Sequence, residues 1–119
     1  MNIVRKIVSF LAIYLGLFAS GAAQAYGATN GVITALRIDH STNRVFVQLG
    51  NATGGTPPSC ATGTGYTGVM SLESAGAQNT LSLLISARED GVLVYIRGND
   101  TCTVISNFED IGYITVQEG

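Results

Sequence analysis

The sequence predicts a small, mainly β domain with one helix and one disulfide, made as an exported precursor. Three observations carry this prediction. The first 25 residues have the layout of a signal peptide. Most of the remaining chain alternates apolar and polar side chains, as half-buried strands do, and one segment over residues 75–89 has the period of a helix. Two cysteines lie in the part of the chain that export would carry into an oxidising compartment.

The amino-terminal segment begins with the basic pair Arg5 and Lys6 and continues with an almost wholly apolar run over residues 7–18. Small residues follow and end in Ala23-Gln24-Ala25, which predicts cleavage after Ala25. The run is shorter than the ~20 apolar residues that span a membrane, and an uncleaved anchor is the alternative. We therefore expect a signal peptide over residues 1–25, a single domain over residues 26–119, no membrane span after cleavage, and a secreted or periplasmic location.

The predicted mature domain is acidic. It keeps four arginines against eight acidic residues and has no lysine. Proteins that bind nucleic acid carry a basic surface for the phosphate backbone, so we expect no nucleic-acid partner. The arginines are Arg37, Arg44, Arg88 and Arg97.

Cys60 and Cys102 are the only cysteines. In an exported chain they most simply form one disulfide, which closes a loop of about 43 residues. A redox or metal pair is the alternative, but the spacing is not C-x-x-C and only His40 could join a metal site. We expect no metal and no cofactor.

The first two strands are expected over residues 31–39 and 44–50, joined by a turn at residues 41–43 into a hairpin. Alternation assigns one apolar face to each strand, and it turns Phe46 away from that face. The side chains expected to point inward are Val32, Leu36, Ile38, Val45, Val47 and Leu49.

A loop rich in Gly, Thr and Pro is expected over residues 51–65, followed by a third strand over residues 66–73. A helical stripe runs from Ala77 to Arg88, widened by Leu83 and Ala87, and Gly91 is the expected C-cap. Strands over residues 91–98 and 111–117 complete the order β-β-β-α-β-β. That is the order of the OB-fold, a five-stranded barrel with one helix. A two-layer α+β sandwich is the alternative.

Six segments in order carry a resemblance: the opening Gly31-Val32-Ile33, the Pro57–Cys60 loop, residues 83–87, 91–98 and 99–102, and the closing strand over residues 109–116. In this order the chain resembles small secreted OB-fold proteins that are similar to the receptor-binding B subunits of AB5 toxins, nearest the subtilase-cytotoxin type. The resemblance covers residues 31–116. It implies an OB barrel, homo-oligomers such as pentameric rings, and glycan binding. It assigns no ligand-contacting residue in this chain.

Outward aromatic side chains are the candidate ligand contacts, because a ring can stack on the C–H face of a sugar while a few polar groups orient it. The alternative is that loops or a neighbouring subunit cover these rings. The candidate surface consists of Phe46, Tyr66, Tyr95 and Arg97 with the loop residues Thr62 and Thr64.

One Asp-His pair and two Glu-Asp pairs are the candidates for hydrolytic catalysis in the sequence. Asp39-His40 lacks an activated nucleophile, and Glu89-Asp90 and Glu109-Asp110 lie beside glycines or turns where we expect solvent. We therefore predict that the domain is not an enzyme. The predicted function is a secreted binding module for a glycan. The alternative is a structural or assembly protein of the periplasm or cell surface that binds a protein partner.

Overall fold

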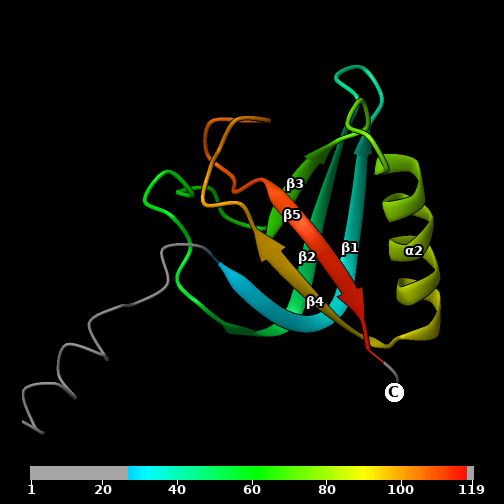
Figure 1. The fold of residues 1–119 in the computed structure, drawn as a ribbon. Coiled ribbons are helices and arrows are strands. Elements are labelled where there is room, and N and C mark those ends of the chain that lie inside the picture. The colour runs from blue at the N-terminus through cyan, green and yellow to red at the C-terminus, as the bar shows by residue number, and fades with distance from the viewer. Residues whose placement is uncertain (1–26, 118–119) are drawn as a thin grey trace, which may run out of the picture.

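The computed structural model describes residues 27–117, so the predicted signal peptide and its cleavage site lie outside the described residues. Within residues 27–117, five strands and one helix follow in the predicted order (Figure 1). They are β1 (Ala28–Asp39), β2 (Arg44–Gly54), β3 (Gly68–Ser71), α2 (Ala77–Asp90), β4 (Leu93–Gly98) and β5 (Ile111–Val116).

The strands form one antiparallel sheet with the order β3-β2-β1-β4-β5. β1 is the central strand: its later part pairs with β2, while its start pairs with both β2 and β4. The sheet is not closed. Its two edges approach at one place, where the backbone N–H of Val69 donates to the carbonyl of Glu109 at 3.1 Å and Val69 forms an isolated parallel bridge with Asp110. The barrel that the element order predicted is therefore present only as a curved, open sheet.

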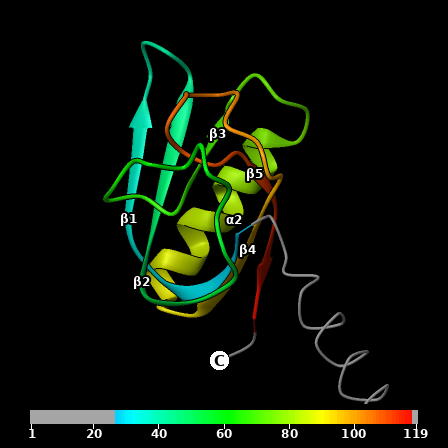
Figure 2. The same cartoon turned by 90° about the vertical axis from the view of Figure 1, so that its left-hand side faces the viewer.

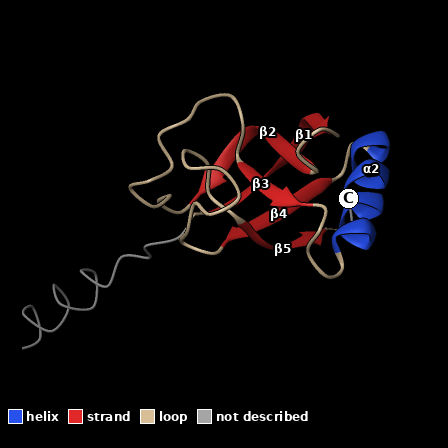
Figure 3. Cartoon of the chain, turned by 90° about the horizontal axis from the view of Figure 1, so that it is seen from above, coloured by secondary structure: helices blue, strands red, loops and turns tan. Residues whose placement is uncertain are grey.

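The core lies between the concave face of the sheet and α2, which sits in the curve between β1–β2 and β4–β5 (Figure 2). Leu84 of the helix packs there at 0% exposure beside Val45 and Val94. α2 ends as predicted at Gly91, whose φ of 65° is a left-handed conformation that favours glycine. Seen from above, α2 and the long loops lie on opposite sides of the sheet (Figure 3). Within residues 27–117, no helix is both long enough and apolar enough to span a membrane.

Two predicted apolar faces differ from the structure. The inward face of β2 is confirmed, but in β1 the buried side chain is Ile33, while Ile38 is 49% exposed. Irregularities in the β1–β2 register between Asn30 and Val32 and between Ile33 and Ala35 shift the alternation at Ile33, because a shift of one residue moves a side chain to the other face. Ile38 keeps the predicted side: Leu36 packs against the core, and Ile38 lines a hollow with Leu36 and Ile85, where α2 does not cover it. On α2, Leu83 is exposed because the helix contacts the sheet along one narrow stripe.

Candidate functional site

The predicted disulfide is present and joins two loops on the side of the sheet away from α2. Cys60 lies in the loop after β2 and Cys102 in the loop after β4, with their Cα atoms 6.2 Å apart. The bond ties the Gly/Thr/Pro-rich loop to residues 99–110, which lead into β5. Both loops contribute to the pockets described below, so the disulfide restrains the most irregular part of the domain.

Asp110 organises the second of these loops. Its carboxylate accepts hydrogen bonds from the backbone N–H groups of Thr103 and Val104, each at 3.0 Å, and from the hydroxyls of Thr101 and Thr103. Burial alone would raise the pKa of Asp110, but these hydrogen bonds together outweigh it and hold the pKa below its usual value. The ionised carboxylate therefore holds this loop in place, because it accepts the hydrogen bonds that backbone carbonyls accept in a regular strand.

The neighbouring Glu109 points elsewhere. Its Oε1 accepts the backbone N–H of Gly27 at 3.1 Å, and its Oε2 accepts that of Asp100 at 2.9 Å. A Cβ atom at Gly98 would overlap the Glu109 carboxylate, so the glycine makes room for it. Burial raises the pKa of Glu109, with Asp100 and Asp110 adding repulsion, although the two backbone donors partly oppose this.

The expectation that Glu109 and Asp110 face solvent is wrong. The two residues are only 5% and 6% exposed. Each carboxylate is turned toward a different set of backbone donors, which is a long-range arrangement that neighbouring glycines and turns do not indicate. The pair is therefore not two acids directed across one substrate bond.

The predicted ligand contacts form two separate groups. In the first, the ring of Tyr66 lies 5.1 Å from that of Phe46 and 6.0 Å from that of Phe108, centroid to centroid. Phe46 does point away from the core, but its prediction as a surface contact is wrong, because it is 6% exposed beneath the loops. Thr62 and Thr64 are exposed in the loop that leads to Tyr66.

The second group lies on β4 and β5. Arg97 is paired in register with Tyr113, and its guanidinium lies 5.9 Å from the centroid of that ring. Arg97 also donates to the Tyr113 hydroxyl at 3.4 Å, and the Tyr95 ring lies 6.1 Å from that of Tyr113. The Tyr113 ring is 49% exposed.

The register of β1 shows that these groups do not form one surface. Phe46 is opposite Arg37, and Tyr95 is opposite Asn30. These two positions on β1 are seven residues apart, or about 23 Å along an extended strand. A single small ligand therefore does not reach from Phe46 to Tyr95.

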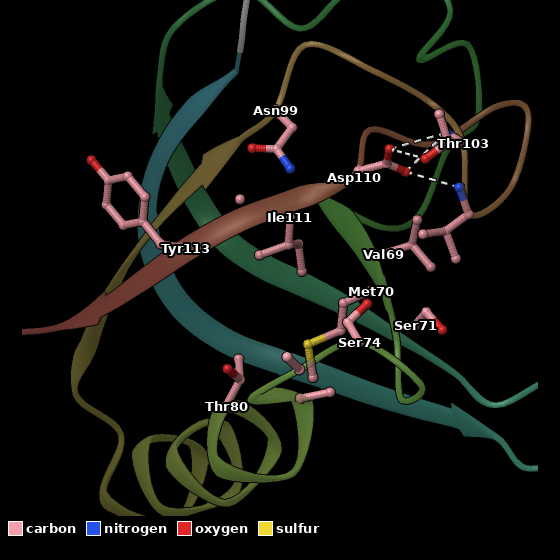
Figure 4. Close-up of a pocket in the computed structure, with 14 residues that line it drawn as sticks. Val69, Met70, Ser71, Ser74, Thr80, Asn99, Thr103, Asp110, Ile111 and Tyr113 are labelled. Atoms are coloured by element: carbon pink, nitrogen blue, oxygen red, sulfur yellow. Dashed lines mark hydrogen bonds between the residues drawn. The ribbon is translucent and has the colours of Figure 1, made fainter.

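A pocket of about 230 Å³, here called the β3–β5 pocket, lies where the sheet is open (Figure 4). Val69, Met70 and Ile111 provide apolar surface, and Tyr113 stands at one end. The polar lining is made of neutral side chains and the fully hydrogen-bonded Asp110. Within residues 27–117, the side chains of Asn99 and Ser74 make no hydrogen bond. The neutral polar side chains are Ser71, Ser74, Thr80, Asn99 and Thr103.

A second pocket of about 220 Å³, here called the loop pocket, lies under the disulfide-linked loops. Tyr66 and Phe108 provide aromatic walls, and Glu109 adds the only acidic side chain in its lining. The Cβ that Gly27 lacks would lie 2.6 Å from Oε1 of Glu109 and 3.5 Å from Cα of Pro57. The absence of that atom keeps the space around the carboxylate open.

The Asp39-His40 pair is part of the β1–β2 turn. The Ser41 hydroxyl and backbone N–H both donate to Asp39, and they hold the pKa of that carboxyl below its usual value. His40 is exposed at the tip of the hairpin, remote from both pockets. In the part of the chain that the structure describes, no three His, Cys, Asp or Glu side chains are grouped to hold a metal ion.

Sequence reasoning did not select Phe108, Asn99 or Glu109 as site residues. Phe108 immediately precedes the acid pair, and an aromatic beside two acids near a cysteine was the available signal. Comparison of the chain with protein-family models, curated proteins and solved structures found no match. The resemblance to AB5 B subunits therefore stays a prediction.

Proposed function

We propose that this chain is a secreted, non-enzymatic binding module that recognises a neutral glycan at the β3–β5 pocket. The observation that carries the proposal is the exposed Tyr113 ring at the end of a pocket with an apolar floor and hydroxyl and amide side chains around it. A sugar ring needs this combination, because one of its faces is C–H and its rim is hydroxyl.

The contacts around Tyr113 favour a fixed stacking platform. Arg97 and Tyr95 both lie against the ring, which limits its rotation without covering it. The unused amide of Asn99 and hydroxyl of Ser74 are available for the rim of a ligand. Because the oxygens of Asp110 are already occupied by four donor groups, the charge in the pocket is not available to a cation, and a neutral ligand fits best.

The proposal of binding rather than catalysis is supported by the divergence of the two buried carboxylates. Glycosidases direct two carboxyl groups at one bond, about 5–10 Å apart across the sugar. Here Asp110 lines the β3–β5 pocket and Glu109 lines the loop pocket. The lining of the β3–β5 pocket therefore has one acid, whose oxygens already accept hydrogen bonds, and it has no second acid that could act with it in hydrolysis.

We further propose that the open sheet has the topology of an OB-fold and that the module assembles into a ring, as its resemblance to AB5 B subunits implies. The strand order and the parallel bridge between Val69 and Asp110 support the OB-type topology. Light scattering on the purified protein measures the assembly directly. A strict monomer at all concentrations would remove the ring from the proposal.

A glycan array followed by titration calorimetry tests the binding proposal. Tyr113→Ala should abolish measurable binding, whereas Tyr113→Phe should retain most of it because the stacking surface remains. Thr64→Ala, in the exposed loop away from this pocket, is the matched control and should bind as the wild type does. Full binding by Tyr113→Ala, or an array without any bound glycan, would contradict the proposal.

The alternative function, a structural or assembly protein, is favoured by one different observation. Ile38 and Ile85 are 49% and 42% exposed, and they line a hollow of about 250 Å³ with Arg88 and Glu89. Exposed apolar side chains around a hollow are typical of protein contacts. A pull-down from the native envelope distinguishes the two functions. A stoichiometric protein partner whose binding is lost in Ile85→Asp but kept in Tyr113→Ala would support this alternative.

A further inference from the structure

Glu109 brings a buried negative charge to the loop pocket. The side chain is 5% exposed, and its two backbone donors, Gly27 and Asp100, make three hydrogen bonds with it. A carboxylate offers about four acceptor positions, so one position on Oε1 is left unused. The charged groups that act on it, Asp100 and Asp110, are both acidic, so they repel its charge. A buried charge is costly unless an opposite charge accompanies it. The pocket is therefore electrostatically suited to a cation.

The aromatic walls narrow the chemistry of that cation. Tyr66 and Phe108 both line the pocket, with their ring centroids 6.0 Å apart. Phe46 lies against both rings at 5.1 and 5.9 Å and holds them in place. Aromatic faces attract organic cations, and a carboxylate adds directional acceptors for N–H groups. An alkylammonium group has N–H donors for the carboxylate and carbon atoms that pack against the rings, whereas a hydrated metal ion has neither.

We propose that the loop pocket binds a primary ammonium group, with Oε1 of Glu109 accepting one of its N–H groups and Tyr66 and Phe108 covering its carbon atoms. This site is distinct from the β3–β5 pocket and does not depend on glycan binding. Two sources could supply the group. One is an external alkylamine. The other is the chain itself, because the predicted cleavage after Ala25 frees the amino group of Tyr26, which is bonded to Gly27, and the N–H of Gly27 already donates to Glu109.

The composition of the chain makes the two sources separable. No lysine follows Lys6, so the cleaved chain would have only one primary amine, at its amino terminus. Acetylation of the exported protein with an amine-selective reagent would therefore block that group alone. The acetylated and untreated proteins are each titrated with ethylammonium chloride, with ethanol as the neutral control, while the amide NMR signals of Gly27 and Asp100 are followed.

Ethylammonium should shift these signals in the acetylated protein, and ethanol should not. Binding to the acetylated protein alone identifies the amino terminus as the natural occupant, and binding to both forms identifies an external amine. Either result supports the ammonium site. No shift in either form, or equal shifts with ethanol, would overturn it. Glycan binding by the same samples is measured separately, so failure of this site and failure of the proposed function are distinguishable.

Variants link the binding to the named side chains. Glu109→Gln should weaken ethylammonium binding about tenfold or more, because the charge-assisted contact is lost. Tyr66→Leu should weaken it about two- to fivefold through the lost aromatic face, and it tests the site even if the Glu109 variant does not fold. Glu73→Gln, an exposed acid in the turn between β3 and α2, is the matched control. Wild-type affinity in both Glu109→Gln and Tyr66→Leu, or an equal loss in Glu73→Gln, would contradict the proposal.

Discussion

Replacing Asp110 with asparagine should destabilise the domain far more than the same replacement at Asp100. The Asp110 carboxylate is buried and accepts the backbone N–H groups of Thr103 and Val104. Asparagine has one acceptor oxygen instead of two. That oxygen can keep both backbone N–H groups, because both of them reach Oδ1. The hydroxyls of Thr101 and Thr103, which donate to Oδ2, would then meet an amide NH2 and lose their acceptor, at a cost of about 1–3 kcal/mol. The contacts that remain lose their charge assistance, which costs about 1 kcal/mol more. We therefore expect Asp110→Asn to lower the free energy of unfolding by about 3 kcal/mol.

Urea unfolding at pH 7, followed by far-UV circular dichroism, measures this change. With a slope of about 1–2 kcal/mol per molar urea, the midpoint should fall by about 1.5–3 M. Asp100→Asn is the control: Asp100 is exposed, and its φ of 64° is a conformation that asparagine also adopts. That variant should change stability by less than about 0.5 kcal/mol.

The pH dependence gives the refuting result. Because the pKa of Asp110 is lowered in the folded protein, its stabilisation is present above the unfolded value of about 3.9 and is lost as the pH falls through the folded value. The difference between wild type and Asp110→Asn should therefore shrink in acid. Equal midpoints at neutral pH, or a difference that persists undiminished at about pH 2.5, would show that the ionised Asp110 carboxylate does not stabilise the domain.

The disulfide, the aromatic contacts of Phe46 and the charge of Glu109 each give a further prediction. Reducing Cys60–Cys102, whose positions are 42 apart, should remove about 4 kcal/mol on the chain-entropy model. Thermal unfolding with and without reductant tests this, and unchanged melting would contradict it. Phe46→Ala should cost about 3–5 kcal/mol in urea unfolding, because the ring is buried against two others; a loss below about 1 kcal/mol would mean that the site is not packed. Since the pKa of Glu109 is raised, its favourable contribution is present in acid and lost as the pH rises through the folded value. In amine-acetylated protein and a buffer without amines, where no ammonium group reaches Glu109, the melting temperature of Glu109→Gln should therefore gain on that of the wild type as the pH rises from about 4. A constant difference would contradict this.

The elements that short-range patterns specify were predictable. The inward face of β2 follows from plain alternation, and the end of α2 follows from the conformational freedom of Gly91. The pairing of Cys60 with Cys102 followed from the number of cysteines and the expected compartment, and the structure confirms it. The element order was also correct. The prediction of a closed barrel was not correct, because β3 and β5 approach each other only at one bridge at Val69.

The features that failed depend on residues distant in the sequence. Glu109 is buried because Gly27, 82 positions earlier, donates to it and because Gly98 leaves space for it. Phe46 is covered because Tyr66 and Phe108 converge on it from two different loops. Ile33 is buried, although alternation predicted it on the outer face, because the register between β1 and β2 is irregular there. A pattern within one segment contains none of this information, so the candidate site could be only partly predicted.

The hydrogen bond between Gly27 and Glu109 has a consequence for the order of folding. A chain is synthesised from its amino end, and this contact cannot form until nearly all of it has been made. β1 can pair with β2 at once, but its other neighbour, β4, is synthesised only after the whole of α2. Contacts between such distant positions slow folding. Until β4 has been made, the edge of β1 that pairs with it has no partner strand. Proteases and chaperones have their best access to the nascent domain during that interval.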